Sequence, residues 1–84
     1  MDTSHACGEQ QVIGGRIRAY RLDLSITQTE LGHRLWRQHT HTWISRAEAG
    51  NIRFTAPLLM QIAEGLRISY SGLVQGTSFE VSHG

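Results

Sequence analysis

Apolar residues recur at helical spacing through the middle of the chain, and they predict a fold of short helices without strands. Ile13 and Ile17, for example, are four positions apart and therefore share one face of a helix. Helices of this length are not stable alone and must pack together around a single core. The residues that we expect in this core are Ile13, Ile17, Tyr20, Leu31, Leu35, Ile44, Leu59, Ile62 and Leu66.

Capping residues divide this pattern into five helices. Thr27 followed by Glu30 has the sequence of a capping box at the start of the second helix. Thr40 suits the start of the third helix, and Gly50 suits its end because glycine readily adopts the left-handed conformation. The helices are expected at about 11–22, from Thr27 to about Leu35, at 40–49, from Thr55 to about Leu66, and at 70–75.

The length of 84 residues is typical of one domain. Residues 1–10 and 77–84 are small and polar, so we expect a flexible N-terminal tail and a C-terminal tail around a helical domain at 11–76. No apolar run approaches the ~18 residues that a membrane span needs. The single cysteine, Cys7, cannot form an internal disulfide. These features favour a cytoplasmic protein without membrane contact.

The basic residues are concentrated within the expected helical domain. All eight are arginines, and residues 12–76 hold these eight against four acidic residues, a net charge of +4. The planar guanidinium suits phosphate and guanine, although codon usage in a GC-rich genome also explains an all-arginine composition. Arg16 and Arg18 are expected to face solvent.

The stretch "THTWISRAEAG" at 40–50 has two chemically different faces. Ile44 and Ala47 share an apolar face that suits packing against the core. The major groove of DNA is about 12 Å wide and admits one α-helix, which must be apolar behind and polar in front. The polar face of this stretch carries His41, Thr42, Ser45 and Arg46.

At this point the chain resembles the lambda-repressor/Cro-like (Xre-type) helix-turn-helix DNA-binding regulators, over roughly residues 12–75. The resemblance is carried by the order and spacing of "IRAYR" (17–21), "SITQTELG" (25–32), "ISRAEAG" (44–50) and "TAPLLMQIAEGLRISYSGL" (55–73). It implies an all-α fold, a compact bundle of about five short helices, whose third helix reads double-stranded DNA.

The resemblance also implies roles for individual residues. Base contacts are expected from His41, Thr42, Ser45 and Arg46, with Arg46 the best candidate for a bidentate guanine contact. Arg21 and Glu48 match an ion pair that joins the first helix to the third, and Gln28 matches a residue that holds phosphate and braces the third helix. The expected DNA-backbone contacts are Thr27, Gln28, Arg37, Gln38, His39, Trp43 and Arg53.

The turn "WRQHT" at 36–40 is longer than is usual in this family, and bulky Trp36 or Arg37 takes the place of the usual turn glycine. The third helix can therefore start before Thr40. The longer turn can itself reach DNA, and for this reason the expected backbone contacts include Arg37, Gln38 and His39.

Several residues near these helices have alternative or packing roles. Trp43 either stacks on a sugar or a thymine methyl, or packs on the protein, and Trp36 is expected to pack in the core. Gly32 is a small residue where the third helix has to approach the second. Gly14 and Gly15 are expected to weaken the start of the first helix.

We expect a transcriptional regulator, a repressor by default, that acts as a homodimer on a palindromic operator, with a toxin or polymerase as a potential partner. The alternative is an antitoxin or another protein-interaction module on the same fold. No catalytic motif is present, so we expect no enzymatic activity, no cofactor and no metal; His39 and His41, two positions apart, would not face each other on a helix. The expected dimer interface is Ile68, Tyr70, Leu73 and Val74, extended by Phe79.

Overall fold

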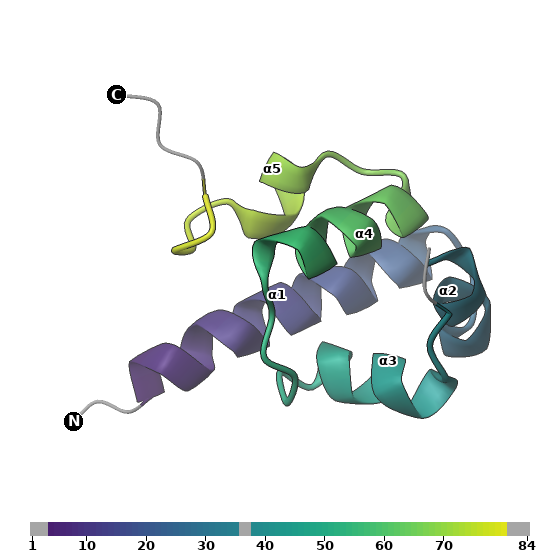
Figure 1. The fold of residues 1–84 in the computed structure, drawn as a ribbon, viewed down its shortest axis with the longest axis horizontal. Coiled ribbons are helices and arrows are strands. Elements are labelled where there is room, and N and C mark those ends of the chain that lie inside the picture. Colours follow the sequence, from purple (N-terminus) through teal and green to yellow (C-terminus); the bar gives the residue numbers. More distant parts are fainter. Residues whose placement is uncertain (1–3, 36–37, 81–84) are drawn as a thin grey trace.

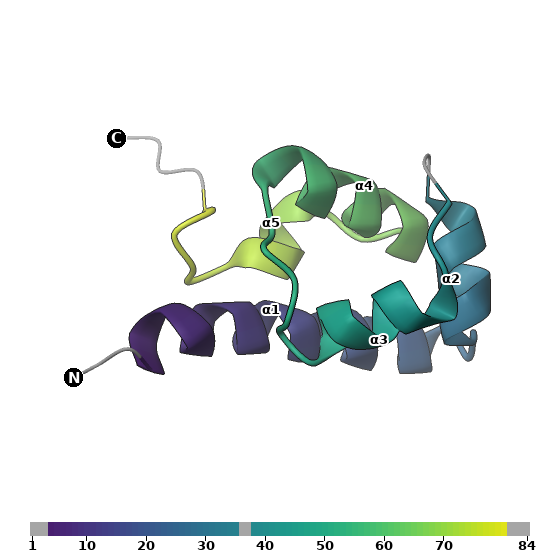
Figure 2. The ribbon, with the colours of Figure 1, turned by 60° about the horizontal axis from the view of Figure 1, so that its bottom comes forward.

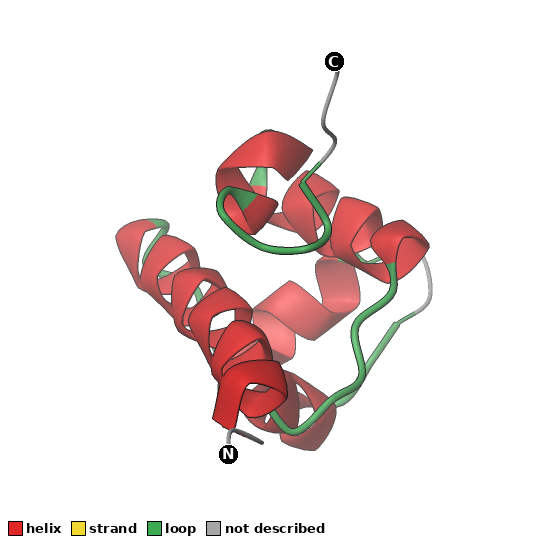
Figure 3. Cartoon of the chain, turned by 90° about the vertical axis from the view of Figure 1, so that its left-hand side faces the viewer, coloured by secondary structure: helices red, strands yellow, loops and turns green. Residues whose placement is uncertain are grey.

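Five α-helices account for most of the computed structural model, which describes residues 4–35 and 38–80 (backbone only for 4–7). They are α1 (Ser4–Asp23), α2 (Gln28–Arg34), α3 (His41–Glu48), α4 (Ala56–Leu66) and α5 (Tyr70–Val74). The described segments are joined by loops and contain no strand, as Figure 3 shows. The prediction of an all-α fold is confirmed. None of the helices in these segments combines the length and the apolar character that crossing a bilayer requires.

The helices are arranged so that α3 and α5 lie on different sides of α1. α3 packs against α1 and α2, whereas α5 packs against α1 and α4. Figures 1 and 2 show the same division, with α3 along one side of the molecule and α4 and α5 along the other. Within the described segments, one side of α3 is left without a covering helix.

The prediction of a tail at 1–10 is wrong for residues 4–10, which form the first turns of α1. Tertiary contacts stabilise this extension, because the carboxylate of Glu9 accepts hydrogen bonds from both the backbone N–H (3.0 Å) and the hydroxyl of Ser78. The segment 77–80, predicted as part of the C-terminal tail, is thereby held against α1. Residues 81–84 lie outside the described part of the chain.

The residues predicted to cap the middle helices do so, although in the capping box predicted for α2 the Glu30 carboxylate pairs with Arg34. The Thr40 hydroxyl accepts a hydrogen bond from the Trp43 N–H at 3.2 Å, so α3 starts where Thr40 predicted it and not earlier in the turn. At the other end of α3, Gly50 has φ +80°, and the next N–H, that of Asn51, donates to the Arg46 carbonyl at 2.9 Å. This pattern ends the helix and satisfies its last carbonyl groups.

Of the nine residues first predicted for the core, all are buried except Tyr20, which is half-buried at its edge; Trp36, also expected to pack there, lies outside the described residues. The prediction of Leu73 and Val74 as dimer-interface residues is wrong, because both are fully buried, at 0% exposure, on the inner side of α5. Ile68 and Tyr70 are half-buried against the same core, and the Tyr70 hydroxyl donates to the Phe79 carbonyl at 3.2 Å. The buried apolar residues are Ile13, Ile17, Ile26, Leu31, Leu35, Ile44, Ala47, Phe54, Leu59, Ile62, Ala63, Leu66, Leu73 and Val74.

Candidate functional site

The uncovered side of α3 is polar. Ile44 and Ala47, on its inner side, are 1% and 0% exposed and belong to the core. The outer side offers imidazole, hydroxyl and guanidinium groups, which are the donors and acceptors that recognise the edges of bases. All four residues predicted to contact bases are exposed there: His41, Thr42, Ser45 and Arg46.

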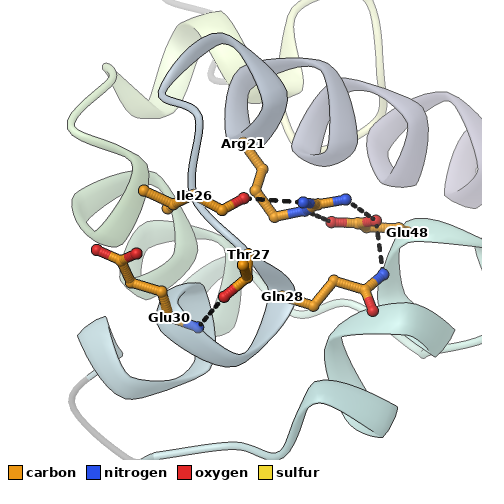
Figure 4. A network of polar contacts seen from close by, with 6 residues as sticks. All are labelled: Arg21, Ile26, Thr27, Gln28, Glu30 and Glu48. Carbon is orange, nitrogen blue, oxygen red and sulfur yellow. Dashed lines mark hydrogen bonds and ion pairs between the residues drawn. The ribbon is translucent and has the colours of Figure 1, made fainter.

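A buried network fixes α3 to the two helices behind it (Figure 4). The Arg21 guanidinium, from α1, donates to the Glu48 carboxylate through Nε at 2.6 Å and through Nη2 at 3.2 Å. Its Nη1 donates to the Ile26 carbonyl at 2.9 Å. From α2, Gln28 Nε2 donates to the same Glu48 carboxylate at 3.1 Å. The ion pair that the resemblance implied is thus formed, and Gln28 braces it.

The ion pair in this network is largely buried. The side chains of Arg21 and Glu48 are only 10% and 5% exposed. A charged hydrogen bond in such surroundings is stronger than one in water, and an unpaired partner would be costly to bury. The rotation of α3 about its own axis is therefore strongly determined, and with it the direction in which its polar side faces.

Two glycines allow neighbouring backbone to approach closely around α3. A Cβ atom at Gly14 would lie 2.6 Å from the Glu48 carbonyl oxygen, so no other residue fits there without displacing the end of α3. A Cβ at Gly32 would collide with the His39 carbonyl, and the His39 N–H donates to the Gly32 carbonyl at 3.2 Å. Gly32 is thus a point of close approach, as predicted, but to the segment that leads into α3.

The candidate backbone contacts lie at both ends of α3 and at the start of α2. The Thr27 hydroxyl caps α2 by accepting from the Glu30 N–H at 3.0 Å. His39 stacks on Trp43, with ring centroids 3.9 Å apart, and Trp43 packs partly on the core. Arg37 and Trp36 lie outside the described residues. The exposed members of the set are Thr27, Gln38 and Arg53, and the half-buried ones are Gln28, His39 and Trp43.

The arginines fall into two groups. Those with structural partners include Arg16, which donates to the carbonyls of Leu73 (3.1 Å) and Gln75 (2.7 Å) at the end of α5 and so does not simply face solvent. Arg34 lies 3.4 Å from the Glu30 carboxylate. Among the residues that the structure describes, the exposed arginines whose side chains make no hydrogen bond or ion pair are Arg18, Arg46, Arg53 and Arg67.

A hollow of about 270 Å³ lies where α1, α2 and α3 meet. Ser45 and Ala49 border it from the outer side of α3, so it opens beside the polar side of that helix. Sequence reasoning did not find Arg18 at this site, because its proximity to Ser45 depends on how α1 crosses α3. The residues that line the hollow are Arg18, Arg21, Gln28, Ser45, Glu48 and Ala49.

In the parts of the chain that the structure describes, no three His, Cys, Asp or Glu residues are grouped so as to hold a metal ion. Comparisons with protein-family models, with curated proteins and with solved structures gave no match. The lambda-repressor-like family and fold therefore stay predictions from the sequence motifs.

Proposed function

We propose that this chain is a sequence-specific double-stranded DNA-binding transcriptional regulator, in which α2 and α3 form a helix-turn-helix of the lambda-repressor-like fold. The observation that carries the proposal is the orientation of α3. Its apolar side is buried and the Arg21–Glu48–Gln28 network holds it in place. Its polar side, with His41, Thr42, Ser45 and Arg46, is exposed, and no helix of the described segments covers it. A helix held in this way can enter the major groove without rearrangement.

The neighbouring groups suit the DNA backbone. In a helix-turn-helix the first helix crosses the backbone while the second lies in the groove. Gln28 stands at the first position of α2, and its amide nitrogen has a second N–H beyond the one that meets Glu48. Arg53 is exposed in the loop that follows α3. These groups supply phosphate contacts, which set register and orientation.

Selectivity calls for two copies of the domain on one site. A good bidentate base contact contributes only about 1–3 kcal/mol of discrimination, and α3 offers few side chains. A homodimer on a palindrome doubles the readout, with half-sites about one helical turn, ~34 Å, apart. Because Leu73 and Val74 are internal, the surface between copies has to be formed by other residues.

Selection of bound sites from a pool of random duplex DNA, followed by footprinting, tests the proposal. The expected result is an enriched motif with dyad symmetry and half-sites one turn apart. The double variant His41→Ala/Arg46→Ala serves as the control, since both residues are exposed and the fold should survive their loss. No enrichment and no binding by the folded wild-type chain at low salt would reject the proposal and favour a protein-binding role.

A further inference from the structure

We propose that Arg18 of α1 binds a phosphodiester group of the bound DNA, in the hollow that it lines together with Gln28 and Ser45. This inference rests on the proposed function and adds a contact from a third helix to it. The geometry points to Arg18 because it is exposed, lines the hollow, and its side chain makes no hydrogen bond or ion pair with the described residues. Its guanidinium is therefore free to bind a ligand from outside.

The hollow has room for a phosphodiester group, and it opens beside the outer side of α3. Its volume is about 270 Å³ and it is open to solvent, so a phosphodiester group can enter it from outside. Its wall includes Ser45, on the outer side of α3, and the exposed Ala49, which directly follows that helix. A strand that passes along the flank of α3 would therefore run across the mouth of the hollow.

The charges in the wall suit an anion. The one carboxylate there, that of Glu48, already accepts three hydrogen bonds, two from Arg21 and one from Gln28. Its charge is balanced by the Arg21 guanidinium, which leaves the positive charge of Arg18 uncompensated. A phosphate would meet this guanidinium and could also accept from the Ser45 hydroxyl.

The position beside α3 favours phosphate over a base edge. An α-helix with its side chains is about 10–12 Å wide, which nearly fills a major groove of about 12 Å. A group on a neighbouring helix is therefore kept at the rim of the groove, where the sugar–phosphate strand lies. Arg18 should consequently contribute affinity without sequence preference.

The test measures binding of short random-sequence duplexes over a series of salt concentrations. The variants are Arg18→Ala, Arg18→Lys and, as a matched control, Arg67→Ala, which removes an exposed arginine after α4. Loss of one phosphate contact should reduce the slope of log K against log[salt] by about 0.9. We expect this reduction for Arg18→Ala, little change for Arg18→Lys because the charge is kept, and no change for Arg67→Ala.

The outcomes separate this inference from the proposed function. If the wild-type chain binds duplex DNA but Arg18→Ala leaves the slope unchanged, the Arg18 site is wrong and the proposed function stands. Equal reductions for Arg18→Ala and Arg67→Ala would also overturn the site, since they would reflect net charge alone. If the wild-type chain binds no duplex at low salt, both proposals fail. Circular dichroism and melting of each variant exclude misfolding as the cause.

Discussion

The guanidinium of Arg21 on α1 donates to the carboxylate of Glu48 on α3, with Nε 2.6 Å from Oε2, while both side chains are almost fully buried. Removing one partner would leave a buried charge uncompensated. We therefore expect Arg21→Ala to lower the free energy of unfolding by about 3–5 kcal/mol, as measured by urea denaturation.

A matched control for this variant is Arg18→Ala, three positions earlier on the same helix. Arg18 is exposed and has no bonded partner among the described residues, so its loss should change stability by less than about 0.5 kcal/mol. An unchanged unfolding free energy for Arg21→Ala would show that the ion pair does not stabilise the fold.

The neighbouring glycines Gly14 and Gly15 are expected to respond in opposite directions to replacement by alanine. A Cβ at Gly14 would lie 2.6 Å from the Glu48 carbonyl oxygen, whereas at Gly15 nothing lies within 4 Å. Gly14→Ala should destabilise the chain by about 1–3 kcal/mol through overpacking. Gly15→Ala should stabilise it by about 0.5–1 kcal/mol, since alanine favours the helix interior.

Thermal melting of the two alanine variants gives the comparison directly. Both substitutions add one methyl group to the same helix, so their effects on helix propensity cancel. The difference between the two melting temperatures therefore reports the contact of Gly14 with α3. Equal shifts of the melting temperature for both variants would contradict the close approach at Gly14.

Arg46→Ala is expected to change sequence preference as well as affinity. Arg46 is exposed on the outer side of α3, and its side chain has no ion pair with a described residue. Its guanidinium group is therefore available to donate two hydrogen bonds to a guanine. The loss should be about 1–3 kcal/mol on the selected site, with a relaxed preference at one base pair of each half-site. Titration of a set of single-base-pair variants of that site measures both quantities.

Gln28→Ala is the contrasting variant for Arg46→Ala, because Gln28 stands at the proposed phosphate-facing end of α2. It should weaken binding about equally at every sequence and leave the ratio of specific to random affinity unchanged. If Arg46→Ala weakens binding equally at every sequence, Arg46 contacts phosphate and not a base. If Gln28→Ala alters the base preference, the assignment of Gln28 to phosphate is wrong.

The Glu9 carboxyl is expected to titrate abnormally because of Ser78. Hydrogen bonds from the Ser78 side chain, and secondarily from its backbone N–H, hold the pKa of Glu9 below its ordinary value. Since this pKa is lower in the folded than in the unfolded chain, the contact stabilises the fold above the ordinary glutamate pKa. That stabilisation is lost as the pH falls through the lowered pKa.

An NMR titration of the Glu9 side chain in the wild type and in Ser78→Ala tests this effect. The substitution removes the hydroxyl donor and should raise the pKa of Glu9 toward the ordinary value, while the backbone donor retains part of the shift. The same titration midpoint in both proteins would mean that the C-terminal segment does not rest on α1 in solution.

The parts of the fold that could be predicted are those set by local sequence. α3 is the clearest case, because its start depends on the Thr40 hydroxyl and its end on the left-handed Gly50, both readable without knowledge of the rest of the chain. The division of α3 into a buried and an exposed side follows from its 3.6-residue period in the same way.

The parts that could not be predicted depend on contacts between distant segments. α5 has only five residues, little more than one turn, so periodicity could not indicate that Leu73 and Val74 point inward. Phe54 is buried from a loop, where no periodicity exists. The start of α1 is held by Ser78, which lies at the opposite end of the chain.

The candidate site shows the same limit. The exposed polar residues on the outer side of α3 could be predicted from that helix alone, but the hollow beside them could not. Arg18 and Gly14 gain their roles only from the way α1 crosses α3, and a sequence pattern contains no information on that crossing.

The most direct test of the account is an NMR titration of the isotope-labelled chain with the selected duplex, read as chemical-shift changes of backbone amides. The account predicts the largest changes at His41–Arg46, with Gln28 and Arg53 also affected and α5 little changed. Changes concentrated in α4 and α5, or none at any salt concentration, would contradict the claim that the outer side of α3 binds DNA.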